Sequence, residues 1–118
     1  MTIRQLEAND WEPYFDRVSK ALVGRRAFVE VAALSLGDQV AAEWVPIIGI
    51  TYDPKDDILE LALEGLDHLI HKPRQVFVDE GPMGLASAEA IDEANRRHII
   101  RLKEPLMLPA RSGAGQSG

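Results

Sequence analysis

The sequence predicts a small α+β domain in which one amphipathic helix near the N-terminus packs on an antiparallel sheet. Apolar residues recur at helical spacing between residues 11 and 23, and much of the remaining chain alternates apolar and polar residues between turn signals. A chain of 118 residues fits a single domain. We expect that domain to span residues 1–109, and residues 110–118, which are small and polar, to form a disordered tail.

The helix is predicted from Trp11 to Val23. Asn9 or Asp10 can cap its first turn, Pro13 fits within that turn, and a helix commonly ends before a glycine such as Gly24. Its apolar face consists of Trp11, Tyr14, Phe15, Val18 and Leu22. A face this rich in aromatic residues predicts that the helix docks on a sheet.

Five or six strands are predicted after the helix, as a sequential meander. They cover residues 27–36, 40–52, 58–63, 75–79, 85–91 and 97–103. Asp53-Pro54-Lys55-Asp56-Asp57 predicts a tight turn, whereas Leu66 to Ile70 is expected to form one helical turn or a loop. Such a meander could curl into a small, partly open barrel, because Sm-like barrels have the same order of elements.

Composition and charge narrow the classes of function. The chain lacks cysteine, a signal-peptide core and any apolar run long enough to span a bilayer, so we expect a cytoplasmic protein without membrane association. Its net charge of −6 argues against non-specific binding to nucleic acid. The charge is uneven, since acids gather in residues 53–67 and bases in residues 96–111.

One cluster has the character of metal ligands. If Asp67, His68 and His71 lie on one helical turn, the two imidazoles face the same way and a carboxylate adjoins them, an arrangement that a divalent ion such as zinc could use. The third histidine, His98, is distant in sequence. The alternative is that one histidine anchors a turn through a backbone bond while the other lies in solvent.

No catalytic motif is present. The chain contains no nucleophile elbow, no glycine-rich phosphate loop and no calcium-loop spacing, so the sequence leaves enzymatic activity open and favours a non-enzymatic role. The first hypothesis is therefore a self-association or protein-interaction module, with a homodimer as the commonest assembly. One alternative is a metal- or small-ligand-binding enzyme centred on Asp67, His68 and His71. The other is an Sm-like RNA binder that uses Arg96, Arg97, Arg101 and Lys103, although aromatic residues for base stacking are scarce among them.

Four segments are similar to those of a small bacterial family whose members are uncharacterised. They are Trp44–Asp57, Leu63–Ile70, Val78–Pro82 and Glu104–Pro109. The resemblance covers nearly the whole chain, from the Trp11 helix to Pro109. It implies a bacterial origin and a complete, stand-alone domain, but it implies no activity, cofactor or catalytic residue.

Overall fold

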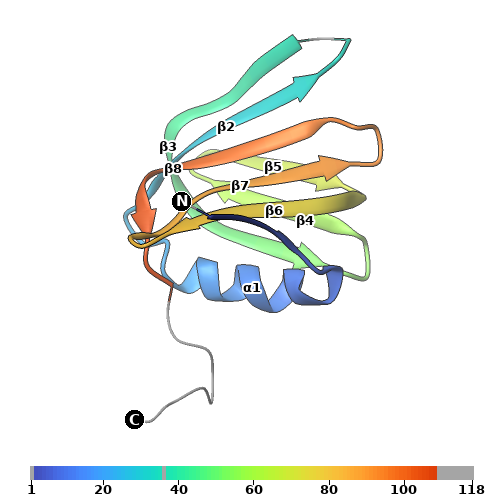
Figure 1. The fold of residues 1–118 in the computed structure, drawn as a ribbon. Coiled ribbons are helices and arrows are strands. Elements are labelled where there is room, and N and C mark those ends of the chain that lie inside the picture. The colour runs from blue at the N-terminus through green and yellow to red at the C-terminus, as the bar shows by residue number, and fades with distance from the viewer. Residues whose placement is uncertain (1, 36, 109–118) are drawn as a thin grey trace.

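The computed structural model describes residues 2–35 and 37–108. It confirms an α+β fold made mostly of antiparallel sheet, with one helix (Figure 1). The elements are β1 (Thr2–Leu6), α1 (Ala8–Lys20), β2 (Arg26–Ala33), β3 (Gly37–Asp53), β4 (Ile58–Leu63), β5 (Leu66–His71), β6 (Pro73–Gly81), β7 (Gly84–Asp92) and β8 (Arg97–Leu106). Residues 110–118, predicted to be a disordered tail, lie outside the described residues.

The predicted number and order of elements were wrong in two respects. The sheet has eight strands rather than five or six, and a strand, β1, precedes the helix. The strand order is β1-β6-β7-β8-β2-β3-β4-β5, so two short meanders join where β8 pairs with β2, and the sheet does not close. Strand β1 was not predicted because it is an edge strand in which only Leu6 is buried, so its sequence does not alternate apolar and polar residues.

Strand β3 is the element that bends the sheet. Its first half pairs with β2, and its second half, from Ile47 to Asp53, pairs with β4. Glu43 and Trp44 together oppose the single residue Phe28, and the backbone of Trp44 adopts a positive φ of 53°. Two further register shifts occur along β3, one before this bulge at Ala41 and one after it at Ile48. Such bulges kink a strand and increase its twist, so one continuous strand belongs to two parts of the sheet.

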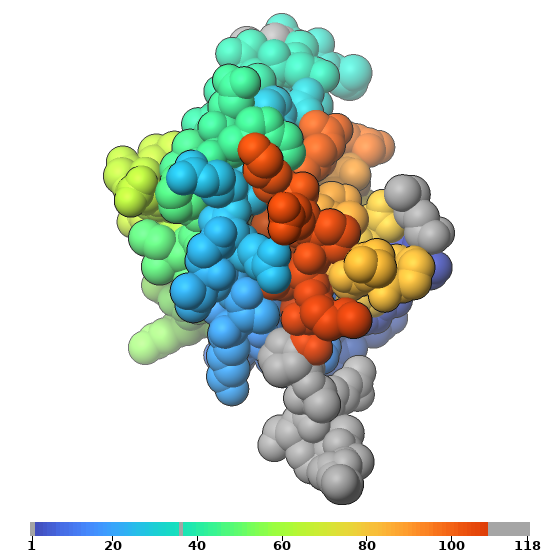
Figure 2. All heavy atoms as spheres, turned by 90° about the vertical axis from the view of Figure 1, so that its left-hand side faces the viewer, coloured from blue at the N-terminus to red at the C-terminus, as the bar shows by residue number. Residues whose placement is uncertain are grey.

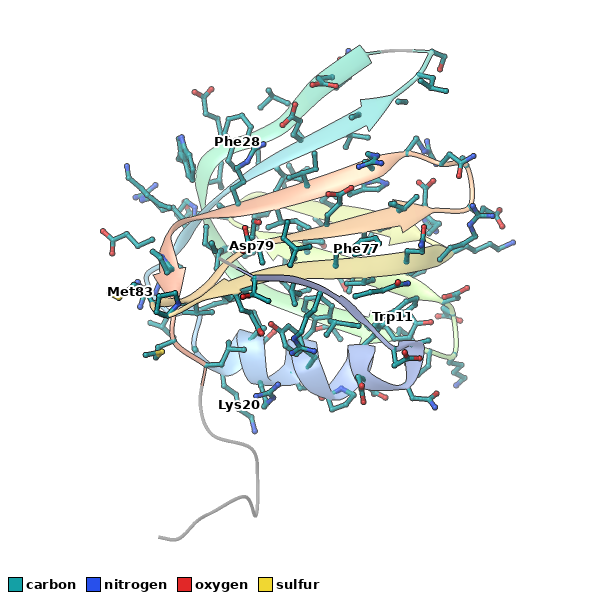
Figure 3. All side chains as sticks on the ribbon, viewed as in Figure 1. Trp11, Lys20, Phe28, Phe77, Asp79 and Met83 are labelled. Atoms are coloured by element: carbon teal, nitrogen blue, oxygen red, sulfur yellow. The ribbon has the colours of Figure 1, made fainter. Side chains whose placement is uncertain are left out.

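Helix α1 lies along an open side of the bent sheet, chiefly against β3 (Figures 1 and 3). It begins earlier than predicted, at Ala8, and residue Glu7 at its N-terminus makes no side-chain capping bond. Asn9 and Asp10 therefore lie inside the helix rather than capping it, and Pro13 lies beyond the first turn. The indole N–H of Trp11 instead donates to the carbonyl of Leu6 at 3.3 Å, which fixes the entry of the chain into the helix.

The core fills the space enclosed by the sheet and α1. The predicted apolar face of the helix is buried, and so are alternate apolar residues of β4 and β8, namely Leu59, Leu61, Leu63, Ile100 and Leu102. Its largest fully buried side chains are Phe15, Leu22, Leu59, Leu61, Ile70, Leu85 and Leu106. Burial of apolar surface on this scale is the main favourable contribution to folding.

Residues 66–71 form strand β5, so the predicted helical turn or loop was wrong. The segment is short and half polar, but Leu66 to His71 pairs residue by residue with β4. The hairpin turn at Gly65, where φ is +78°, makes this pairing possible because glycine adopts that conformation without strain. The strand predicted around residues 85–91 is confirmed as β7.

We predict that Ile70→Ala lowers the free energy of unfolding by about 2–5 kcal/mol, the usual cost of truncating a buried aliphatic side chain. Ile70 is 0% exposed, whereas its neighbour Leu69 is 42% exposed. The matched variant Leu69→Ala should therefore cost only about 0.5 kcal/mol. Urea denaturation of both variants measures the difference, and equal losses would contradict the strand assignment of β5.

Candidate functional site

The three predicted metal ligands do not converge. On strand β5 successive side chains point to opposite faces, so Asp67 is exposed while His68 is half-buried toward the core. His71, three positions on, is exposed at the end of the strand. Within residues 2–35 and 37–108 no group of three or more His, Cys, Asp or Glu side chains could hold a metal ion. Metal binding by Asp67, His68 and His71 stays a prediction.

His68 instead joins a hydrogen-bonded chain of three side chains that crosses the core. Its Nε2 lies 2.9 Å from Nδ1 of His98 on β8, and Nε2 of His98 lies 3.0 Å from Oδ2 of Asp92 on β7. Asp92 is 1% exposed and His98 4%. These two are the buried polar residues of the described core. These hydrogen-bonded side chains connect the outermost strand, β5, to β7 and β8, which lie on the other side of the bend.

The surroundings of Asp92 keep its carboxylate ionised. Burial alone would raise its pKa, but the bond from His98, the backbone N–H groups of Arg96 and Ala94 and the Arg96 guanidinium hold that pKa below its usual value. An ionised carboxylate only accepts hydrogen bonds, so Nε2 of neutral His98 must carry the proton and its Nδ1 must accept. Nε2–H of neutral His68 then donates to that Nδ1. The ionised carboxylate of Asp92 therefore determines which atom donates and which accepts in both hydrogen bonds.

The surroundings of His68 disfavour its charged form. Burial and the neighbouring His98 lower the pKa of His68 below its usual value. Nε2–H of His68 can donate to His98 whether or not Nδ1 of His68 is protonated, so burial, and not the loss of the 2.9 Å bond, is the main penalty for charging His68.

The sequence contained a partial signal for this cluster. Along the predicted 97–103 strand His98 alternates in phase with the apolar residues Ile100 and Leu102, and the structure buries all three. Asp92 lies just beyond the predicted 85–91 strand, and it bonds to Arg96 across the β7–β8 turn. No local spacing connects these residues to His68, because the bend in β3 brings β5 to them.

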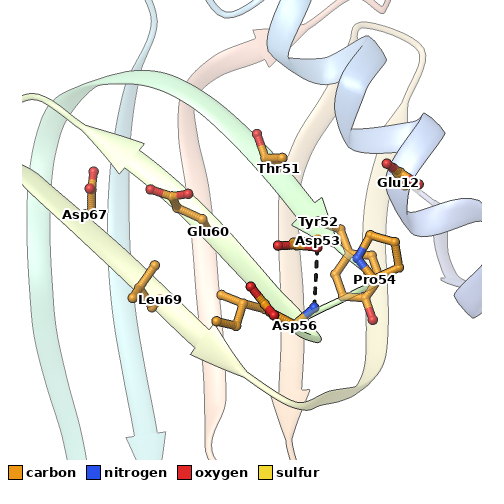
Figure 4. A pocket seen from close by; sticks show the side chains of 10 residues that line it. Glu12, Thr51, Tyr52, Asp53, Pro54, Asp56, Glu60, Asp67 and Leu69 are labelled. Atoms are coloured by element: carbon orange, nitrogen blue, oxygen red, sulfur yellow. Dashed lines mark hydrogen bonds between the residues drawn. The ribbon is translucent and has the colours of Figure 1, made fainter.

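The exposed side of β4 and β5 borders an acidic hollow of about 510 Å³ (Figure 4). Five carboxylates line it, from Glu12, Asp53, Asp56, Glu60 and Asp67. The predicted turn is confirmed at its edge, where the carboxylate of Asp53 accepts the backbone N–H of Lys55 at 3.0 Å. Tyr52 donates to Asp57 at 2.6 Å, and burial together with this bond raises the pKa of Tyr52 to about 12. These contacts account for the turn without a ligand.

A second polar cluster ties β1, α1 and β6 together. The Tyr14 hydroxyl donates to the Glu80 carboxylate, which also pairs with Arg4 at 3.1 Å. The guanidinium of Arg17 lies 5.2 Å from the centre of the Tyr14 ring. Burial and the Glu80 bond raise the pKa of Tyr14 well above its usual value, so the phenol stays protonated as a donor. This cluster fixes the helix on the sheet edge.

The basic residues proposed for RNA binding are mostly neutralised. Arg96 pairs with Asp92, Arg97 with Glu89 at 2.7 Å and Arg101 with Glu30 at 3.3 Å. Lys103 differs, because its ammonium lies 6.0 Å from the centre of the Trp44 ring. Phe28 in turn lies 5.4 Å from Trp44. The structure thus places two aromatic rings beside the end of β8, which the sequence did not indicate.

Comparison with known proteins identifies the family. The model of a family of unknown function, DUF5335, matches residues 2–111. The chain belongs to this family. An uncharacterised protein of Aquifex aeolicus (strain VF5) is 37% identical over 110 residues, which cover 92% of this chain and 99% of that protein.

These matches confirm the resemblance to a small bacterial family without a known activity. No solved structure matches the chain. Among the described residues no helix has both the length and the apolar character needed to cross a membrane.

We predict that stability falls as the pH is lowered from 7.5 to 5. Since His68 has a lowered pKa in the folded state, the unfolded chain binds more protons below about pH 6.5, and the free energy of unfolding decreases there. The lowered pKa of Asp92 adds a loss only at more acidic pH. Urea denaturation at both pH values measures the decline. His68→Asn should reduce it, His71→Asn should leave it unchanged, and equal declines in all three proteins would refute the account.

Proposed function

We propose that this DUF5335 protein is a non-enzymatic self-association module that forms a dimer through the outer face of its sheet. The outer face is the side of β1, β6, β7, β8 and β2 that is turned away from the core. The observation that carries the proposal is an uncovered apolar surface on this face that contains a buried carboxylate oxygen without a hydrogen-bond donor.

Strand pairing places the side chains of the outer face in rows, because paired residues of antiparallel strands point to the same side. The first row is Ile3, Asp79, Ser87, Arg101 and Phe28. The second row is Gln5, Phe77, Glu89, Ile99 and Glu30. Large apolar side chains therefore occur in both rows, and α1 lies beside the sheet rather than over them (Figures 1 and 3).

Asp79 lies in the first row. Its Oδ1 atom is inaccessible to solvent and has no hydrogen-bond partner among the described residues. A buried acceptor left unpaired costs about 1–3 kcal/mol. A donor supplied by a second molecule would remove that cost once the Asp79 side chain turns this oxygen outward.

The positions on either side of β7 are complementary in the two rows, whereas Ser87 and Glu89 of β7 meet their own copies, with Arg97 pairing with Glu89 in each chain. We place a two-fold axis along β7, in the plane of contact between the two molecules. Each row then faces the same row of the second copy, with the order of its strands reversed. Asp79 then meets Arg101 of the second copy, and Phe77 meets Ile99 of the second copy. In the first row Ile3 likewise meets Phe28. A self-complementary patch of this kind is what an isologous dimer requires.

The charges of the outer face also favour contact between two copies. The whole chain carries −6, which would repel a second copy on average. On and beside the outer face, however, acids and bases nearly balance: Glu30, Asp79 and Glu89 against Arg26, Arg97, Arg101 and Lys103. Two copies can approach through this face without net repulsion.

The free edge of β3 is a weaker surface for association. Residues 40–45 pair with β2 only, but exposed Glu43, the bulge at Trp44 and Pro46 interrupt it. Charges, bulges and prolines are the features that prevent edge strands from pairing with other chains.

We predict that Ile99→Arg and Phe77→Arg convert the dimer to a monomer, because each places a charge opposite an apolar residue of the second copy. Sedimentation velocity measures the change. Leu69→Arg, a matched substitution on β5 outside the outer face, should leave the dimer intact.

A charge exchange tests the proposed pairing itself. Asp79→Arg and Arg101→Asp should each weaken the dimer by placing like charges together, and the double variant should restore it in part, because Arg101→Asp also removes the ion pair with Glu30 in the same chain. A wild-type monomer at high concentration would contradict the proposal. A double variant no more dimeric than the single variants would contradict the proposed axis.

A further inference from the structure

We infer a second binding site, at the edge of the outer face where β2 and β8 meet, that takes a nucleotide unit: a phosphate group beside a planar base. The site is a basic hollow of about 110 Å³ lined by Gly24, Arg25, Arg26, Lys103 and Glu104, together with the neighbouring ring of Trp44. The start of β2 and the end of β8 meet at this side of the molecule (Figure 2).

The hollow concentrates positive charge on an acidic protein. Three basic side chains and one acid line it, whereas the chain as a whole carries −6. Arg25 lies 3.6 Å from exposed Glu104. Arg26 and Lys103 have no carboxylate within ion-pair distance among the described residues. Two cations therefore remain available for an anion.

Strand pairing and hydrogen bonds hold these cations in place. Ala27 pairs with Leu102, so Arg26 and Lys103 are adjacent across the β2–β8 ladder. The Arg26 guanidinium also donates to the Trp44 carbonyl at 3.1 Å, which positions the side chain beside the bulge. Arginine and lysine N–H groups directed at one small hollow provide the donors that a phosphate group accepts.

Trp44 determines the class of ligand. Its ring is only partly buried, and both the Phe28 ring and the Lys103 ammonium lie near it. Phosphate alone would need no aromatic ring. A nucleotide uses both features, because its base can stack on an aromatic side chain while its phosphate pairs with the adjacent cations.

The same chemistry occurs in a free nucleotide and in single-stranded RNA, and titration distinguishes them. Probes are adenosine, inorganic phosphate, adenosine monophosphate and an eight-residue oligoadenylate, each added at low ionic strength while tryptophan fluorescence is recorded. We expect the monophosphate to bind more tightly than adenosine or phosphate alone. Stacking on Trp44 should quench the fluorescence, and Trp44→Phe should remove most of that change because Trp11 is buried.

The salt dependence separates the two sources. With two or three phosphates neutralised, binding of the oligoadenylate should follow a slope of about −1.4 to −2.1 in a plot of log affinity against log salt. Tighter, steeper binding of the oligomer than of the monophosphate would identify RNA as the ligand. Equal affinities would identify the free nucleotide.

Lys103→Gln and Arg26→Gln should each weaken binding of both probes about tenfold, the usual effect of losing one charge-assisted hydrogen bond. Arg97→Gln is the matched control, since it removes a base that is paired with Glu89 elsewhere on β8. Failure of both the monophosphate and the oligomer to bind at low salt would overturn the inference. So would equal losses in Lys103→Gln and Arg97→Gln.

Discussion

The fold depends on the way in which one long strand is bent. Strand β3 has 17 residues and leaves β2 at Pro46, so the backbone groups beyond that point lose their partner on one side. Ser19 of α1 takes the place of a strand there. Its hydroxyl donates to the carbonyl of Ile50 at 2.7 Å and accepts the N–H of the same residue at 2.8 Å. Gly49 lies beside this contact, and a Cβ there would be 3.4 Å from the Ser19 hydroxyl, an ordinary van der Waals distance.

The bend determines which side chains are buried on the inner face of the sheet and which strands stay uncovered on its outer face. On the inside it brings β4 and β5 across from β7 and β8, so Leu61 and Ile70 are buried and His68 reaches His98. On the outside it leaves β6, β7 and β8 without a covering layer. Hydrogen bonds thus link β5, β8 and β7 across the core where the sheet stays open, and the outer side of β6, β7 and β8 carries apolar and charged side chains together.

Features that depend on residues close together in the sequence were predicted correctly, whereas features that depend on the pairing of distant strands were missed. The apolar face of α1, the 53–57 turn and the alternation of β4, β7 and β8 were correct because each is set within a few residues. Strands β1 and β5 were missed because they are short and half polar, and only their neighbours define them. The candidate site was predicted least well. His68 was identified, but its partners Asp92 and His98 are distant in sequence, and they meet through the bend.

Hydrogen exchange at the Ile50 amide tests the role of the bend most directly. If Ser19 replaces a strand partner, this amide should be strongly protected in the wild type and should exchange much faster in Ser19→Ala. Thr51, which pairs with Glu60 on β4, provides an internal reference whose protection should persist. Unchanged protection of Ile50 in Ser19→Ala would contradict the claim that the helix holds the bent strand in place.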